Sequence, residues 1–248
     1  MFKKSLFKKT PDFDSEIPKI VINSGTGETV NYNRLKDNII FASDSGKKKV
    51  FQFESAVSGE GKSTVVSNTA VALAKSGKKV IVVDLDFRRP KIHKIFEVQN
   101  VKGISEYMLG ECSKEDLVKK TKYGVDVINR GKATHNASII FTSDRFKDLI
   151  SGLREIYDLI LFDCPPVLLV SDYIHFSQIS DLVIFVACIG VTRRSQLKEA
   201  YELMSKSNGN ILGTVVTYKN AGKFSSRYGG YYNSRYYRSL KNHYAEEN

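Results

Sequence analysis

The segment from Glu54 to Thr64 constrains the fold of this chain more than any other part of the sequence. It reads ESAVSGEGKST, follows an apolar run at residues 50–53 and leads into a helical pattern at residues 65–74. A strand, a glycine-rich turn and a helix in this order direct backbone N–H groups and the positive end of a helix toward one anion. The sequence therefore predicts a phosphate-binding loop rather than an ordinary glycine turn.

Residues within this loop have different expected tasks. Gly59 and Gly61 permit a tight turn, Lys62 can reach the β- and γ-phosphates of a nucleotide, and the Ser63 hydroxyl can ligate Mg²⁺. Ala56 stands where the usual pattern has its first glycine. We expect the nucleotide to contact Ser58, Gly59, Glu60, Gly61, Lys62, Ser63 and Thr64.

Composition and length limit the class of protein. With 248 residues, 42% of them hydrophobic, the chain suits one α/β domain with appendages. No apolar run has the roughly 20 residues that a membrane-spanning helix needs, and residues 1–9 lack the apolar core of a signal peptide. The three cysteines and four histidines show no metal-ligand spacing, so we expect a cytosolic protein without a disulfide framework or a zinc site. The net charge of +11 favours anionic partners or serves solubility.

Hydrophobic periodicity divides the chain into three parts. Residues 1–30 are predicted to form a basic flexible arm, which either is solvated or touches an anionic lipid surface. Residues 31–220 alternate helical patterns with apolar runs, which predicts a P-loop domain with a doubly wound, mainly parallel sheet. Residues 221–248 lack aliphatic periodicity and are predicted to be a disordered, tyrosine-rich tail.

The periodicity also predicts the individual elements of the domain. Helices are expected at 31–43, 91–97, 103–110, 113–119 and 146–156, and after Thr192 as an N-cap. Beyond the strand at 50–53, strands are expected at 79–84, 125–128, 159–162, 182–186 and 211–216.

Acidic residues follow two of these predicted strands. Asp84 and Asp86 come at the end of one apolar run, and Asp163 comes directly after another. Because the carboxyl ends of parallel strands meet at one edge of a sheet, we expect these carboxylates to lie beside the phosphate-binding loop. Carboxylates at that edge suit Mg²⁺ bound to a nucleotide.

Three segments resemble motifs of a known family: AVSGEGKST, VIVVDLDFRRP and LILFDCPP. In this order they are similar to the Walker A, A′ and B motifs of the bacterial tyrosine kinases, or BY-kinases. These kinases act in capsule and exopolysaccharide production. The resemblance implies a P-loop fold unrelated to eukaryotic protein kinases and ATP with Mg²⁺ as phosphoryl donor. By position, Lys62 would hold the phosphates, and Ser63, Asp86 and Asp163 would hold the metal. Asp84 would accept or orient the proton of the attacking tyrosine, although Asp84 and Asp86 could exchange roles.

The resemblance also gives the tail a function. Six of the 13 tyrosines lie there and would be autophosphorylated in trans between neighbouring subunits: Tyr228, Tyr231, Tyr232, Tyr236, Tyr237 and Tyr244. It further implies activation by the cytosolic segment of a transmembrane partner, a cognate tyrosine phosphatase, and a position at the inner face of the membrane through that partner. Nucleic acid is not an expected partner, although tyrosines among arginines could stack on single strands.

Departures from the family pattern leave alternatives. The family uses a Glu-x-x-Arg-x-x-Arg helix in ring-shaped oligomers, whereas this chain has Val30, Asn33 and Lys36 there, and residues 129–136 lack the usual prolines. A homo-oligomer is therefore expected from the resemblance, not from these residues. The rivals are a partition or septum-placement ATPase, whose signature lysine is here Val57, and a catalytically weak ATP-binding regulatory subunit.

Overall fold

The structure is a computed structural model that describes residues 19–22, 27–134 and 137–218. The predicted tail with its six tyrosines and most of the predicted arm lie outside these residues. The division of the chain into arm, domain and tail therefore stays a prediction.

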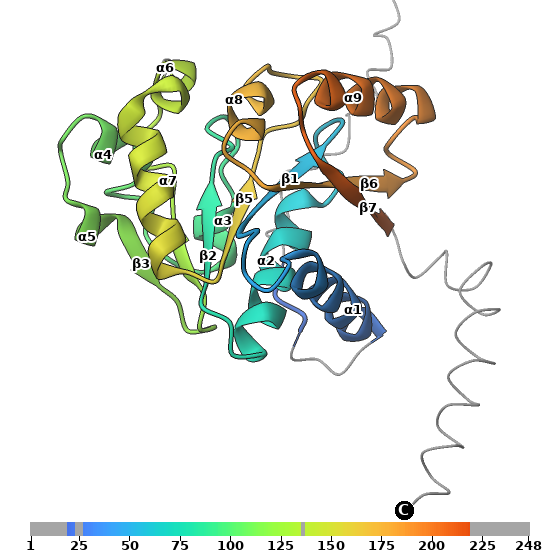
Figure 1. Ribbon diagram of the computed structural model, residues 1–248, viewed down its shortest axis with the longest axis horizontal. Coiled ribbons are helices and arrows are strands. Elements are labelled where there is room, and N and C mark those ends of the chain that lie inside the picture. Colours follow the sequence, from blue (N-terminus) through green and yellow to red (C-terminus); the bar gives the residue numbers. More distant parts are fainter. Residues whose placement is uncertain (1–18, 23–26, 135–136, 219–248) are drawn as a thin grey trace, which may run out of the picture.

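A seven-stranded sheet forms the centre of the domain, in the order β3-β4-β2-β5-β1-β6-β7 (Figure 1). Only β3 and β4 pair antiparallel, and every other neighbouring pair is parallel. This confirms the predicted mainly parallel sheet. The strands are β1 (Val50–Ser55), β2 (Val80–Asp84), β3 (Val118–Lys120), β4 (Asp126–Ile128), β5 (Leu159–Asp163), β6 (Leu182–Ile189) and β7 (Ile211–Tyr218).

Helices cover both faces of this sheet, which confirms the doubly wound α/β class. One face packs against α1 and α2, and the other packs against α7 and α9. The helices are α1 (Gly27–Ala42), α2 (Lys62–Lys75), α3 (Ile92–Ile95), α4 (Ile104–Met108), α5 (Lys114–Leu117), α6 (Ala137–Thr142), α7 (Asp144–Ile156), α8 (Tyr173–Ser177) and α9 (Arg194–Lys206).

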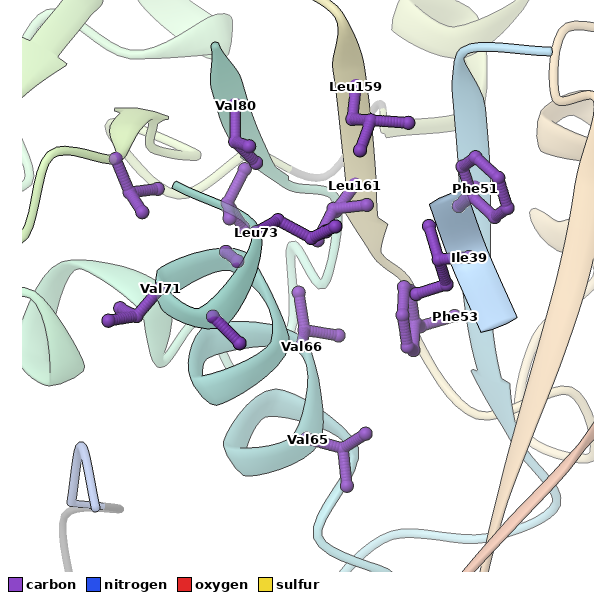
Figure 2. Packing of buried hydrophobic residues seen from close by; sticks show 14 of the residues in the cluster. Ile39, Phe51, Phe53, Val65, Val66, Val71, Leu73, Val80, Leu159 and Leu161 are labelled. Atoms are coloured by element: carbon purple, nitrogen blue, oxygen red, sulfur yellow. The ribbon is translucent and has the colours of Figure 1, made fainter. Parts of the chain in front are cut away.

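The central strands are apolar on both faces because both faces are covered. Alternate residues of β1, β2 and β5 point toward α2, where Phe51, Val80 and Leu161 pack beside Leu73 (Figure 2). Their neighbours along each strand point into a second cluster under α7. No helix in the described part of the chain is long and apolar enough to cross a membrane.

Several predicted boundaries are corrected by the structure. The helix α1 begins at Gly27, four residues before the predicted start, and Ile22 of the predicted arm is packed in the core. Residues 118 and 119 belong to strand β3, not to the helix predicted there, because Val118 and Lys119 pair with β4. Thr192 is not an N-cap, since α9 begins at Arg194. The short helices α6 and α8 were not predicted at all.

Candidate active site

The candidate site lies at the edge of the sheet where β1, β2 and β5 end. Asp84 and Asp163 are the last residues of β2 and β5, and they are register partners across the two parallel strands. Phe53 of β1 is the partner of Asp163 on its other side. The structure thus brings the two predicted acidic segments together beside the predicted loop.

The predicted loop joins the end of β1 to the start of α2. Gly59 and Gly61 have φ angles of 85° and 86°, a backbone region that favours glycine, and Gly61 is the residue just before the helix. No side chain caps this helix start. The first N–H groups of α2 are therefore directed toward the loop, where an anion can accept from them.

Ala56 fits the loop without strain. It is not among the described residues with positive φ, so its position does not require glycine. Its side chain is fully buried in an apolar cluster with Val167, Tyr173 and Val183. The substitution of the usual first glycine is thus explained by the local backbone.

Glu60 fixes the shape of the loop through bonds on three sides. Its carboxylate accepts the backbone N–H of Val57 at 2.8 Å and the hydroxyl of Thr192 from the β6–α9 connection. Its carbonyl oxygen accepts the hydroxyl of Thr217, on β7, at 2.7 Å. Burial raises the pKa of Glu60, and the hydrogen bonds from Thr192 and Val57 oppose this. The loop is therefore attached to β7 and to the connection between β6 and α9.

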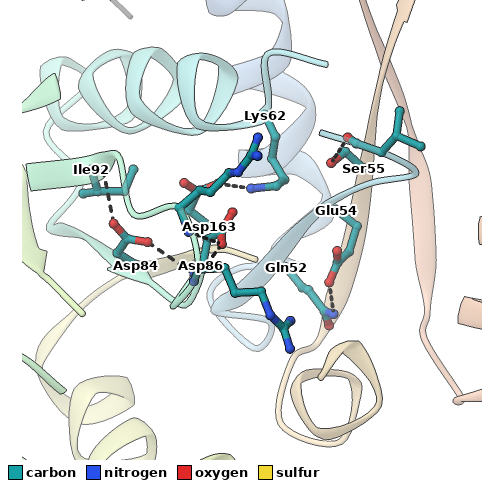
Figure 3. Close-up of polar contacts among 11 residues, drawn as sticks. Gln52, Glu54, Ser55, Lys62, Asp84, Asp86, Ile92 and Asp163 are labelled. Atoms are coloured by element: carbon teal, nitrogen blue, oxygen red, sulfur yellow. Dashed lines mark hydrogen bonds and ion pairs between the residues drawn. The ribbon is translucent and has the colours of Figure 1, made fainter. Parts of the chain in front are cut away.

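Lys62 and Asp163 form a buried ion pair. The Lys62 Nζ lies 2.5 Å from Asp163 Oδ1, and the two side chains are 6% and 0% exposed (Figure 3). Burial lowers the pKa of Lys62, but the carboxylates of Asp163 and Asp86 outweigh it and hold this pKa above its usual value. Lys62 is therefore a fixed positive charge at the start of α2. The second Asp163 oxygen, Oδ2, is buried and has no hydrogen-bond partner.

Asp84 and Asp86 occupy different environments (Figure 3). Asp84 is fully buried, and its two oxygens accept the backbone N–H groups of Ile92 at 3.2 Å and Asp86 at 3.3 Å. Burial, followed by repulsion from Asp163 and Asp86, raises the pKa of Asp84 well above its usual value. Asp86 is only partly buried and accepts the N–H of Arg89 at 2.9 Å. The Asp84 carboxylate thus fixes the backbone at Asp86 and at Ile92 through hydrogen bonds.

A cavity at this edge brings most of the predicted site residues together. Asp86 lines it, whereas Asp84 and Asp163 are fully buried and are not among its lining residues. Arg89 and Lys91 also line it, and the sequence reasoning did not single out these two cationic residues. The basic run FRRPK directly after Asp86 could have indicated that cations lie at this site. The lining residues are Ser55, Ser58, Gly59, Glu60, Gly61, Lys62, Ser63, Thr64, Asp86, Arg89, Lys91 and Pro166.

Glu54 is a further ionisable group near the end of β1 that the sequence reasoning did not assign. It is fully buried, and its Oε1 accepts a hydrogen bond of 2.7 Å from Gln52 (Figure 3). Its Oε2 has no hydrogen-bond partner. Burial raises the pKa of Glu54 to about 8, although Gln52 and Lys62 act against this. The amino-acid sequence around Glu54 gives no sign that this glutamate is buried.

The donor set fits a magnesium ion shared with a nucleotide. Among the described residues, no group of three His, Cys, Asp or Glu side chains could hold a metal by itself. Mg²⁺ bound to nucleotides usually takes few protein oxygens, together with phosphates and waters. The Ser63 hydroxyl, Asp86 and the unpartnered Oδ2 of Asp163 are oxygen donors of this kind.

Comparison with known proteins gives consistent matches. The AAA domain family matches residues 48–210. Tyrosine-protein kinase YwqD of Bacillus subtilis (strain 168) is 32% identical over 205 residues, 82% of this chain and 86% of that protein. Putative tyrosine-protein kinase CapB of Staphylococcus aureus is 28% identical over 217 residues, 86% of this chain and 95% of that protein.

Solved structures also match this chain, and they differ in how similar they are to it. The kinase domain of Escherichia coli tyrosine kinase ETK is 28% identical with a TM-score of 0.76, over 82% of this chain and 81% of that one. The chimerical protein CapA2B2 is 28% identical with a TM-score of 0.76, over 81% and 92%. The septum site-determining protein MinD from Pyrococcus horikoshii OT3, complexed with Mg-ADP, is 25% identical with a TM-score of 0.57, over 68% and 69%. The chain is thus more similar to the kinase structures than to this MinD structure.

Proposed function

Since the chain belongs to the bacterial tyrosine-protein kinases, or BY-kinases, of the AAA domain family and is a protein-tyrosine kinase, we propose that it phosphorylates tyrosines of its own C-terminal tail in trans. The proposed acceptors are the six tyrosines between Tyr228 and Tyr244. We propose ATP with Mg²⁺ as the donor, and regulation of capsular or exopolysaccharide biosynthesis and export as the role. The cavity between the loop and Asp86 is the observation that carries this proposal.

The loop residues would bind the triphosphate. Ser58 to Thr64 line the cavity, and α2 begins within this segment at Lys62, so its uncapped N–H groups and positive end would favour an anion there. Lys62 would contact the β- and γ-phosphates, and Arg89 and Lys91 add positive charge to the cavity lining. These groups would neutralise the negative charge that develops as the γ-phosphoryl group leaves.

Residues at the strand ends would hold the metal and handle the proton. Mg²⁺, held by Ser63, Asp86 and Asp163, would supply charge neutralisation at the β- and γ-phosphates. The tyrosine oxygen forms a bond to the γ-phosphorus while the bond from this phosphorus to the β–γ bridging oxygen breaks. With Asp86 at the metal, Asp84 would accept or orient the tyrosine proton. If Asp86, which lines the cavity, accepts this proton instead, Ser63 and Asp163 would hold the metal. Asp84 would then orient Asp86 through the bond that it accepts from the Asp86 N–H.

Incubation with Mg-ATP and mapping of phosphotyrosine by mass spectrometry test this function. Wild type should carry phosphate on tail tyrosines, and Lys62→Met should carry none. Lys75→Met, at the exposed opposite end of α2, is the matched control and should behave as wild type. Release of free phosphate without phosphotyrosine would instead support the septum-type ATPase, and ATP binding without either product would support a regulatory subunit.

A mixing experiment tests transfer between subunits. Isotope-labelled Lys62→Met protein, which keeps its tail, is combined with unlabelled wild type and Mg-ATP. Phosphotyrosine on the labelled chain would establish transfer in trans, whereas phosphate on the unlabelled chain alone would contradict it.

The partners follow from the family and are proposals for this chain. We propose a cytoplasmic protein held at the inner face of the membrane by the cytosolic segment of a transmembrane activator. We also propose a homo-oligomer and a cognate tyrosine phosphatase that reverses the modification. Tail phosphorylation would invert the positive charge of the tail and loosen subunit contacts. Light scattering before and after phosphorylation tests this, and an unchanged mass would contradict it.

A further inference from the structure

A second cavity lies at the end of the sheet opposite to the candidate active site. Its volume is about 740 Å³, and it is lined by residues of the loops that lead into β1, β2 and β5. These parallel strands begin here, whereas Asp84 and Asp163 mark the edge at which β2 and β5 end. Within the described part of the chain, the two cavities share no lining residue, so they are separate sites.

The loops that lead into β1 and β2 have nearly the same short sequence. Residues 45–50 read SGKKKV and residues 76–80 read SGKKV, and each ends on the first residue of a buried strand. Because β5 lies between β1 and β2 in the sheet, the two loops flank the start of β5. The acidic residues of the cavity lining are Asp44 and Asp158. The lysines of the two loops outnumber them: Lys47, Lys48, Lys49, Lys78 and Lys79.

Local bonds hold both loops in place. Asp44 pairs with Lys47 at 3.4 Å between Oδ2 and Nζ, and Asp158 accepts the backbone N–H of Lys79 at 2.8 Å. The ammonium group of Lys49 donates to a carbonyl oxygen of α7 at 2.6 Å. The two acidic residues thus bond within the loops, and the lysines are presented on a preformed surface, which lowers the entropic cost of binding.

Phe41 adds an exposed aromatic side chain to this basic cavity. It lies near the end of α1, lines the cavity and is 90% exposed, whereas Ile39, two residues earlier, is fully buried in the core. The carboxylate of Asp37, one helical turn before Phe41, is paired with Lys36 at 3.1 Å. An apolar side chain beside clustered lysines is the combination that binds the boundary between lipid headgroups and acyl chains.

We propose that a basic face, which consists of Phe41 and the five lysines of the two loops, binds the surface of an anionic lipid bilayer. The lysine ammonium groups attract the phosphates of the headgroups, and Phe41 enters the layer below them. One apolar side chain alone binds a bilayer weakly, so the lysines and Phe41 must act together. This contact goes beyond the proposed kinase function, and it needs neither ATP nor a transmembrane partner.

Co-sedimentation of the full, unphosphorylated chain with lipid vesicles tests the role of the lysines. The vesicles are phosphatidylcholine alone or phosphatidylcholine with about one-third phosphatidylglycerol, and only the second kind should bind the protein. Lys48→Gln/Lys78→Gln, one change in each loop, should bind roughly thirtyfold more weakly than wild type. The matched control is Lys198→Gln/Lys206→Gln, which removes the same net charge from exposed positions on α9 and should bind as wild type. An equal loss in both variants would overturn the proposal.

Tryptophan fluorescence tests the position of Phe41. The chain contains no tryptophan, so Phe41→Trp introduces a single fluorophore at the proposed contact. Its emission should shift to shorter wavelength with the phosphatidylglycerol vesicles and not with phosphatidylcholine alone. Leu109→Trp, at a position that is 71% exposed directly after α4, is the control and should not shift.

Two outcomes of this measurement would overturn the proposal. If vesicles bind Phe41→Trp without a shift in its emission, another part of the chain, such as the lysines of residues 1–9, contacts the lipid. If the emission shifts without vesicles, and more so as protein concentration rises, a second copy of the chain covers Phe41 instead.

Discussion

The ammonium group of Lys62 lies 2.5 Å from the carboxylate of Asp163, and both side chains are buried. The pair joins the first residue of α2 to the last residue of β5, so it ties the phosphate-binding loop to the strand ends that carry the acidic residues. A buried charge that loses its partner is costly, because the remaining group has neither water nor counter-ion.

Removal of the lysine should therefore lower stability as well as activity. We expect Lys62→Met to lower the free energy of unfolding by about 3 kcal/mol, since Asp163 is left buried and unpaired. The double variant Lys62→Met/Asp163→Asn should recover part of this loss but no kinase activity. Urea denaturation and phosphotyrosine assays measure the two effects. Unchanged stability of Lys62→Met would show that the pair does not stabilise the fold.

Loss of Lys62 should also reduce phosphoryl transfer more than loss of any single carboxylate. Phosphoryl transfer depends mainly on positioning and charge neutralisation, and the lysine serves both. Initial rates of tail phosphorylation for Lys62→Met, Asp84→Asn, Asp86→Asn and Asp163→Asn compare the groups. A carboxylate variant slower than Lys62→Met would contradict the ranking.

The buried carboxyl of Glu54 should make stability depend on pH. Its pKa is raised from 4.5 to about 8, so between these values the folded protein retains a proton that the unfolded chain has released. The free energy of unfolding then falls as pH rises, by about 1.4 kcal/mol for each pH unit in this window. Glu54→Gln should lack this contribution and be more stable than wild type at pH 8, with little difference at pH 4.5.

Urea denaturation of both proteins across this pH range measures the effect. The wild-type slope includes other groups such as Asp84, so the difference between the two proteins is the quantity to compare. Glu199→Gln, at an exposed position on α9, is the matched control and should follow wild type. If the free energies of unfolding of Glu54→Gln and wild type change in parallel with pH, Glu54 is not a buried, protonated carboxyl group.

The sequence was sufficient for those features that depend on local patterns. Apolar runs marked the buried parallel strands, and the residue after each run marked the edge where Asp84 and Asp163 meet. Features that depend on tertiary contacts were missed. Thr192 has the residue type of an N-cap, but its hydroxyl instead bonds Glu60, 132 positions away. The environment of Glu54 likewise includes Cys164, 110 positions away, which no local pattern places beside it.

The Thr192 hydroxyl should contribute to nucleotide binding through the loop. It accepts the N–H of Cys188 at 2.8 Å and donates to the Glu60 carboxylate, which in turn holds Val57. Thr192→Val should weaken ATP binding about fivefold, which corresponds to about 1 kcal/mol for one hydrogen bond. Titration with a fluorescent nucleotide measures the dissociation constant. Thr214→Val, on β7 away from the loop, is the control; equal affinities in the two variants would contradict this role.

The loop backbone distinguishes positions that need glycine from one that does not. Gly61 has a φ of 86°, and a Cβ there would make an ordinary contact with Thr217 at 3.6 Å, so Gly61→Ala introduces backbone strain without a clash. We expect a loss of about 1 kcal/mol in stability and weaker nucleotide binding. Gly59→Ala, where a Cβ would meet nothing within 4 Å, should show the same backbone strain, and urea denaturation with the fluorescent-nucleotide titration measures both variants.

Ala56→Gly is the opposite test, because it restores the glycine of the usual pattern. Ala56 does not have positive φ, and its methyl group packs in a buried cluster with Val167 and Val183. The change should lower stability by about 1 kcal/mol, because a buried methyl group is lost and glycine adds freedom to the unfolded chain. Nucleotide affinity should stay unchanged, since the backbone of residue 56 does not need glycine. Urea denaturation and the fluorescent-nucleotide titration measure both. Tighter binding by Ala56→Gly would mean that the alanine constrains the loop when nucleotide binds.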